Sequence, residues 1–234
     1  MGYRSENKGV SSPVEKYIEW KSNDKAFSYY DKEKQDRVPV KMPITFIALD
    51  DFFGVSGGEM DDSGTFHPVK SGIAAHLGKQ IVVKKDGQTV VQGIWKEIKD
   101  KVKSIGGRYT SYTYAVIDGE LVCFKFAGAA LAAWFEKKGD GAKVTVKDSV
   151  EKKKGGIKYF SPVFETSELS DKDIAELEKS DALKKFDEYA EAKKKQKLSD
   201  DDTESDPGEK EIEPNLAPEE DDDDIAEKLE NIPY

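Results

Sequence analysis

Side chains able to perform catalysis are few and scattered in this sequence. The chain has two histidines, His67 and His76, and one cysteine, Cys123. A metal site needs three or four converging ligands, and neither histidine has a cysteine or a third histidine nearby. Cys123 lies in a strand-like run between Val122 and Phe124, which favours a packed thiol over a nucleophile. The sequence therefore predicts no metal site and no cofactor.

Carboxylates are the only potentially catalytic side chains that cluster in the sequence. Asp50, Asp51, Glu59, Asp61 and Asp62 lie within one short segment. Such a cluster could bind Mg²⁺, and a nuclease that uses Asp50, Asp51 and Asp61 is one hypothesis. Carboxylates that cap turns or face water give the same pattern and are the favoured interpretation. Since the sequence has no Gly-rich phosphate loop of the Walker type either, we expect the protein not to be an enzyme.

Aromatic side chains are more informative, because several of the 24 stand beside basic residues rather than within apolar runs. Such interleaving suits single-stranded nucleic acid: cations follow the phosphates, and flat rings stack on unpaired bases at roughly 1–3 kcal/mol per base. Tyrosine is also common in β-strands, however, where a neighbouring lysine often only solvates the outer face. The candidate DNA contacts form three groups: Trp20, Phe27, Tyr29, Tyr30, Lys32 and Lys34; Arg108, Tyr109, Tyr112 and Tyr114; and Lys152, Lys153, Lys154, Lys158, Tyr159 and Phe160.

Most of the chain up to residue 165 has the composition of strands separated by turns. Asp86-Gly87 and Asp118-Gly119 are typical two-residue hairpin turns, and the glycine-rich segment 54–78 predicts a long loop. Helices are predicted over 94–105, 129–138 and 171–197, the last one capped by Ser170. The expected strands are residues 14–21, 26–31, 38–50, 80–84, 89–93, 108–117, 120–127, 143–147 and 157–165.

These elements favour a mainly β fold of the α+β class. Many short strands with inserted helices fit an OB-fold-like antiparallel barrel, and a generic β-sandwich fits the strand count nearly as well. Alternation along 108–117 places Tyr112 and Tyr114 on one face, which the sequence leaves open as core or groove. The expected divisions are a flexible arm (1–13), an OB-like domain (14–165), a helical extension (166–198) and a disordered acidic tail (199–234).

The net charge of −10 is distributed unevenly along the chain. Residues 199–234 carry a net charge of −14, so the first 198 residues carry +4. The tail contains prolines and almost nothing to bury, which predicts disorder. A basic body can attract a polyanion, and an acidic tail can occupy the same surface in its place.

Nothing in the sequence points to secretion or to a membrane. A single cysteine cannot form an internal disulfide bond. The longest uncharged apolar run, 126–135, is about half of the roughly 20 residues that a membrane helix needs. The N-terminus also lacks the apolar core of a signal peptide. We therefore expect a soluble, cytoplasmic protein with no membrane partner.

The end of the chain carries the most specific signal. The acidic run Asp221–Asp224 precedes a terminal Asn-Ile-Pro-Tyr sequence. In this the chain resembles single-stranded DNA-binding proteins, whose bacterial members end in an acidic run, Ile-Pro and a terminal Phe. It departs from them because Tyr234 stands at the tip and because residues 225–230 separate the acidic run from it.

The body of the chain, over residues 15–165, resembles the single-stranded DNA-binding proteins of phages that infect Bacteroidetes, including crAss-like phages. The segments that carry this resemblance are Trp20 with Phe27–Lys32, Leu49-Asp50, Gly93 with Ile98–Lys103 and Gly106-Gly107, and Phe126–Ala130.

The resemblance implies an OB-fold that binds single-stranded DNA without sequence preference in phage DNA replication or recombination, in the cytoplasm of the infected bacterium. It also implies a tail that competes with DNA and recruits replication or recombination proteins, and it is compatible with oligomers. The alternative is a non-enzymatic protein-interaction or virion-associated module with an acidic partner-binding tail, which the modest +4 of the body suggests. The tail residues concerned are Asp221, Asp222, Asp223, Asp224, Ile232, Pro233 and Tyr234.

Overall fold

The computed structural model describes residues 12–74, 77–139 and 141–201. The acidic tail residues Asp221–Asp224 and Ile232–Tyr234 lie outside the described residues, as do His76 and most of the expected N-terminal arm. The side chain of Lys154 also lies outside the described part of the structure.

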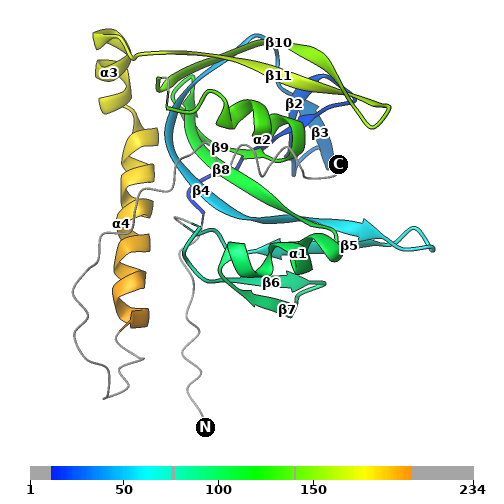
Figure 1. Ribbon diagram of the computed structural model, residues 1–234. Helices are drawn as coiled ribbons and strands as arrows, with labels where there is room; N and C mark the ends of the chain where they lie inside the picture. The colour runs from blue at the N-terminus through cyan, green and yellow to red at the C-terminus, as the bar shows by residue number, and fades with distance from the viewer. Residues whose placement is uncertain (1–11, 75–76, 140, 202–234) are drawn as a thin grey trace.

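Eleven strands of the described chain form one mixed sheet, whose curvature is visible in Figure 1. Their bounds are β1 Tyr17–Lys21, β2 Ala26–Asp31, β3 Asp36–Pro39, β4 Ile44–Met60, β5 Phe66–Ser71, β6 Ile81–Lys85, β7 Gln88–Gly93, β8 Gly107–Ile117, β9 Glu120–Phe126, β10 Lys143–Lys154 and β11 Ile157–Ser167. The order along the main path is β3-β2-β1-β9-β8-β4-β5-β6-β7. Strand β10 pairs with β4 and with β11.

The 17-residue strand β4 organises the sheet, because it pairs with three neighbours. β8 runs along most of it, whereas β10 pairs with its first residues and β5 with its last. Its second half and β5 occupy the segment 54–78, where the prediction of a long loop was wrong. Close backbone packing explains a glycine here: a Cβ on Gly57, whose φ is +139°, would lie 2.4 Å from the carbonyl oxygen of Gly106.

The sheet is not closed, so the expected OB-type barrel is not confirmed. The pairing is not wholly antiparallel either, since β1 runs parallel to β9. The mainly β, α+β character is confirmed, and the expected strand 26–31 agrees with β2 in full. The expected strand 38–50 is divided between β3 and β4.

Two helices pack on the sheet and contribute to separate cores. α1 (Trp95–Ser104) buries Ile98 and Val102 against valines of β4, β5 and β6. α2 (Gly128–Phe135) buries Trp134 among phenylalanines of β4, β9 and β11. Apolar residues at helical spacing predicted both helices within a few residues of their observed ends.

The C-terminal part of the described chain forms two helices, α3 (Asp171–Glu178) and α4 (Asp181–Asp201), where the spacing predicts one over 171–197. The break lies at Ser180, whose Oγ accepts a hydrogen bond from the backbone N–H of Leu183 at 3.2 Å. A serine that caps the following turn competes with continuing the preceding helix, which accounts for the division.

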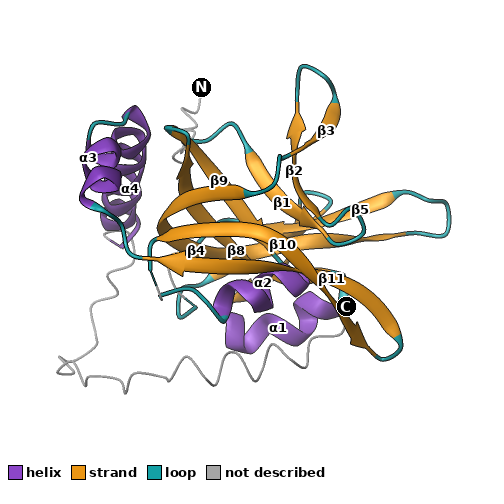
Figure 2. Ribbon diagram, turned by 90° about the horizontal axis from the view of Figure 1, so that it is seen from above, coloured by secondary structure: helices purple, strands orange, loops and turns teal. Residues whose placement is uncertain are grey.

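Helix α4 lies along one side of the sheet (Figure 2). Its residues Ala182, Phe186 and Tyr189 pack against Tyr114 and Cys123 of β8 and β9. The opposite face of these two central strands packs against α2. No helix of the described residues combines the length and the apolarity required to cross a membrane.

Candidate nucleic-acid interface

An open groove lies on the same face of the sheet that α4 covers farther along. Alternation along β8 puts Arg108 and Thr110 on the face that also carries Tyr112 and Tyr114. The groove has a volume of about 500 Å³. It is lined by Glu19, Trp20, Lys21, Arg37, Ser56, Gly57, Phe66, Lys70, Arg108, Thr110, Lys125 and Ala127.

One carboxylate, that of Glu19 on β1, lies among the five cations of this groove. It forms ion pairs with Nζ of Lys125 at 2.7 Å, with the Arg37 guanidinium at 3.0 Å and with Nζ of Lys21 at 3.2 Å. Burial by itself would raise the pKa of Glu19, but the Lys125 hydrogen bond and the three positive charges lower it to about 2. Glu19 therefore stays ionised, and the lining keeps an excess of positive charge.

The other two cations of the groove are aligned across three strands. Arg108 of β8 lies opposite Ser56 of β4, and Ser56 lies opposite Lys70 of β5. Residues directly opposite one another point to the same face of a sheet. Neither Arg108 nor Lys70 forms an ion pair with a described residue. These two charges are therefore available to an anion from solution.

Two exposed aromatic rings accompany the cations of the groove. Phe66 of β5 lines the groove and is 54% exposed, and Tyr30 of β2 is 53% exposed. Tyr30 lies opposite Arg37 in the β2–β3 pair and so shares its face. Trp20 is half-buried, because its ring packs edge-on against Phe27 of the α2-side core. Its Nε1–H donates a hydrogen bond to the Phe160 carbonyl oxygen at 2.9 Å.

The basic β10–β11 hairpin adjoins the groove through this contact. It projects on the side of the molecule away from α3 and α4, as the β4–β5 hairpin does (Figures 1 and 2). The backbone N–H of Phe160 donates to Oγ of Ser22 at 2.7 Å, and Nζ of Lys25 lies 3.9 Å from the centre of the Phe160 ring. The first and third predicted groups thus meet beside Trp20.

The hairpin lysines differ in their surroundings. Lys153 is exposed, Lys158 pairs with Glu151 at 3.0 Å, and Lys152 lies 4.0 Å from Glu136. Tyr159, on the same face as Lys152, is half-buried. The hairpin therefore offers positive charge at the rim of the groove rather than within it.

Three predicted DNA contacts belong to the core and not to an exposed surface. Phe27 and Tyr114 have no exposed surface, and Tyr112 is 7% exposed. Phe27 packs among other aromatic rings of the α2-side core, whereas Tyr112 and Tyr114 lie in the core that α4 helps to cover. None of the three can reach a bound strand without local unfolding.

Four further predicted contacts lie outside the groove lining. Tyr109 is on the opposite face of β8, stacked 5.7 Å from Phe53, and burial raises the pKa of its hydroxyl. Tyr29 is half-buried against the α2-side core. Lys32 and Lys34 are exposed at the β2–β3 turn.

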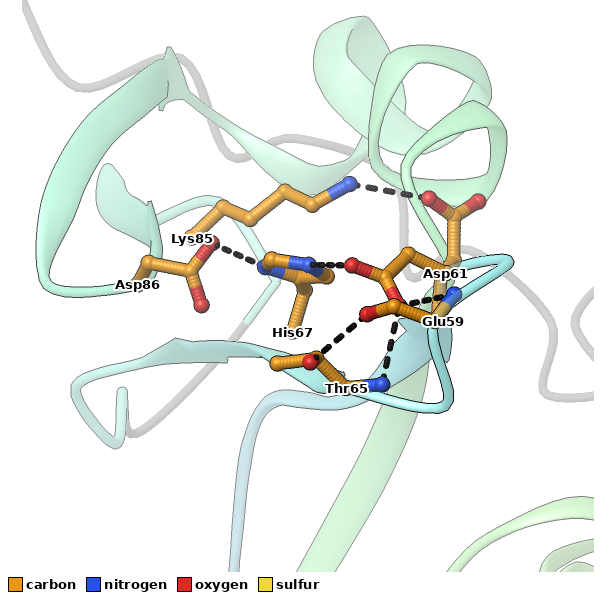
Figure 3. A network of polar contacts seen from close by, with 7 residues as sticks. Glu59, Asp61, Thr65, His67, Lys85 and Asp86 are labelled. Carbon is orange, nitrogen blue, oxygen red and sulfur yellow. Dashed lines mark hydrogen bonds and ion pairs between the residues drawn. The ribbon is translucent and has the colours of Figure 1, made fainter.

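The carboxylates considered for a metal site are held in separate hydrogen-bond networks. The two ring nitrogens of His67 hydrogen-bond to the carboxylates of Asp61 and Asp86, at 3.1 and 2.8 Å respectively (Figure 3). Nζ of Lys85 forms an ion pair with Glu59 at 2.8 Å. These contacts tie the β4–β5 turn to the β6–β7 turn. His67 thus lies in β5, within the segment that the sequence predicts as a loop, and has two carboxylate partners.

Asp51 belongs to a different network within the sheet. Its carboxylate accepts hydrogen bonds from the hydroxyls of Thr113 and Ser111 on β8. The second half of β4 separates it from Asp61, so the structure does not bring together the carboxylates of the nuclease hypothesis. Among the residues that the structure describes, no three His, Cys, Asp or Glu side chains are grouped to hold a metal ion.

The groove lining includes residues that the sequence did not mark as DNA contacts, among them Phe66, Lys70 and Lys125. The first two fall in the segment that its glycines marked as a loop. The outward orientation of Lys125 could have been predicted, since it stands between Phe124 and Phe126 in a strand. A charged residue at that position must face away from the core that the two phenylalanines enter.

Comparison of the chain with protein-family models, with curated proteins and with solved structures finds no match. The groove is therefore the feature from which a function can be inferred.

Proposed function

We propose that the protein binds single-stranded DNA without sequence preference, with the open groove as its binding surface. The observation that carries the proposal is the groove lining, in which five cations accompany one carboxylate and the exposed ring of Phe66. Cations bind phosphates whatever the sequence, and accessible rings stack on any unpaired base. A duplex keeps its base faces stacked inside, so exposed rings favour a single strand.

The charge of the groove predicts a strong dependence of affinity on salt. Each phosphate that a lysine or arginine neutralises releases a counterion. If about four phosphates are contacted, the logarithm of the association constant should fall with the logarithm of salt concentration at a slope near −3. Purely apolar association would give a slope close to zero.

We propose a binding protein rather than an enzyme, with no cofactor. The hydroxyls in the groove, Ser56 and Thr110, bond to each other at 2.6 Å. The one carboxylate of the lining, Glu19, is paired with Lys125, Arg37 and Lys21 and hydrogen-bonds to neither hydroxyl, so it does not activate them as nucleophiles. The lining thus supplies contacts to an anion and to flat rings.

Further parts of the proposal rest on the resemblance of the sequence. They are an OB-type relationship, a role in phage DNA replication or recombination in the host cytoplasm, and a tail that recruits partner proteins. The curved, mainly antiparallel sheet with a basic groove supports the first of these. The charge of −14 in residues 199–234 supports a tail that competes with DNA for the groove.

The experiment is a titration of the full chain with oligo-dT, followed by tryptophan fluorescence and by anisotropy of labelled oligo-dT. Trp20 belongs to the groove lining, whereas Trp134 is buried and Trp95 packs against the core that α1 covers, so bound bases should quench mainly Trp20. Trp20→Phe should lose most of the quenching but keep the anisotropy change. A duplex of equal length should compete weakly. No salt-dependent change in either signal would contradict the proposal.

The tail has its own test within the full chain. Replacing Asp221–Asp224 with asparagines removes four negative charges without shortening the protein. Oligo-dT should then bind more tightly at low salt, and the difference should shrink as salt rises because screening weakens the competitor. Equal affinity of both proteins at low salt would remove the competing role of these residues and leave the groove in place.

A further inference from the structure

Two lysines lie directly opposite each other on neighbouring strands near the groove. Lys70 of β5 pairs in register with Lys84 of β6, and both are exposed. Like charges at opposed positions of an antiparallel pair are destabilising. Neither lysine forms an ion pair with a described residue. An arrangement that costs stability and lacks an internal counterion is suited to an anion from outside.

These lysines extend the row of groove cations across a further strand. The register runs from Arg108 to Ser56, from Ser56 to Lys70 and from Lys70 to Lys84, so all four residues share one face. Strand neighbours lie about 4.8 Å apart, so the row spans roughly 14 Å at the backbone. The small Ser56 leaves space between the longer side chains.

This face is the open side of the β4–β7 part of the sheet. The alternate residues Val55, Val69 and Val83 point the other way and pack in the core that α1 covers. The row therefore lies on the solvent side, and α1 cannot obstruct it.

The exposed ring of Phe66 stands on the same strand and face as Lys70. It lies four residues before Lys70, an even number that returns a strand to the same side. The ring crosses over Gly58, where an added Cβ would come within 2.5 Å of Phe66 Cζ. Because residue 58 is a glycine, the Phe66 ring has room to lie at the edge of the cationic row.

We propose that the phosphate backbone of a bound strand crosses the sheet along Arg108, Lys70 and Lys84, with a base stacked on Phe66. This inference rests on the proposed function and adds a direction and a new contact, Lys84. The cations paired with Glu19 form the other side of the groove and contribute less, since one carboxylate already balances part of their charge.

The test compares two lysine substitutions in the full chain. Lys84→Ala removes a charge from the row, and Lys101→Ala removes an exposed lysine of α1, on the opposite side of the same part of the sheet. Oligo-dT affinity is measured between 0.05 and 0.3 M salt, values chosen to bracket about 0.1 M. Lys84→Ala should weaken binding roughly fivefold at about 0.1 M salt and reduce the salt slope by about 0.7, as the loss of one phosphate contact requires. Lys101→Ala should leave both near their wild-type values.

A stability measurement keeps the binding result interpretable. Removal of Lys84 relieves its repulsion with Lys70, so the ligand-free melting temperature should rise by roughly 1–2 °C rather than fall. If the wild type binds with a salt slope and both lysine variants match it, the path along the row is wrong while the groove stands. If the wild type shows no binding, both the path and the proposed function are wrong.

Discussion

On one face of the two central strands, β8 and β9, one end is buried and the other end is exposed to solvent. At one end Tyr114 and Cys123 lie beneath Phe186 and Tyr189 of α4. At the other end Arg108, like Lys125 across the groove, remains open to solvent. The alternation of side chains along the strands places the buried pair and the exposed pair on this same face. What differs is a helix that begins far along the chain, so long-range packing decides whether a strand residue becomes core or surface.

The electrostatics of the two ends differ in the same way. Burial raises the pKa of the Cys123 thiol and of the Tyr114 hydroxyl, which keeps both neutral. At the open end the surrounding cations lower the pKa of Glu19 to about 2, so it stays charged. The covered end excludes charge, whereas the open end concentrates it, and the following experiments test this division.

The largest effect should come from the same substitution made at each end. Phe186→Ala empties part of the covered core and should lower the free energy of unfolding by about 3–5 kcal/mol. Phe66→Ala at the open end should change it by less than about 0.5 kcal/mol. Chemical denaturation measures both. Similar losses would mean that Phe66 is a packing residue and not a free ring.

Binding should show the reverse order. Phe66→Leu removes a stacking ring while keeping apolar bulk, and oligo-dT affinity should fall by about 1–3 kcal/mol. Phe66→Trp should restore it, since the indole offers a larger flat surface. Anisotropy titrations at fixed salt compare the three proteins. Equal affinity of the leucine and tryptophan variants would exclude stacking at this position.

The charge balance of the groove predicts a smaller change. Glu19→Gln removes the one negative charge of the groove lining, and oligo-dT should bind roughly threefold more tightly. Glu33→Gln, in the exposed β2–β3 turn, is the matched control and should have little effect. Weaker binding of Glu19→Gln would indicate that this carboxylate serves chiefly to order Lys21, Arg37 and Lys125.

The smallest effect should come from pH at the β4–β5 turn. Hydrogen bonds to Asp61 and then to Asp86 raise the pKa of His67. A raised folded pKa stabilises the protein fully below the ordinary value near 6.5, and this contribution is lost as pH rises through the raised value. The melting temperature of the wild type should therefore fall relative to His67→Gln as pH increases through this range. A constant difference between the two at every pH would contradict the assignment.

Local signals in the sequence predicted much of the secondary structure. Asp86 and Gly87 both have positive φ, as their hairpin turn requires, and Ser170 forms the expected cap of α3. Basic–aromatic interleaving found Trp20 and Arg108, which both line the groove. These successes depend on neighbours within a few residues.

The failures depend on distant partners. Glycines of β4 were interpreted as a loop because the close approach of Gly57 to Gly106 is not visible in the local sequence. Tyr112 and Tyr114 have the pattern of a binding face, and only the position of α4 places them in the core. Closure of a sheet is equally non-local, and the open strand order could not be read from strand composition.

The most direct test of the central claim is to map where a strand lies on the full chain. Photo-crosslinking of oligo-dT that carries 5-iodouracil, followed by peptide mass spectrometry, identifies the side chains next to the bases. The account predicts crosslinks at Phe66 and Tyr30, around the open end of the face. Crosslinks confined to α1 or to the outer side of α3 and α4 would contradict it.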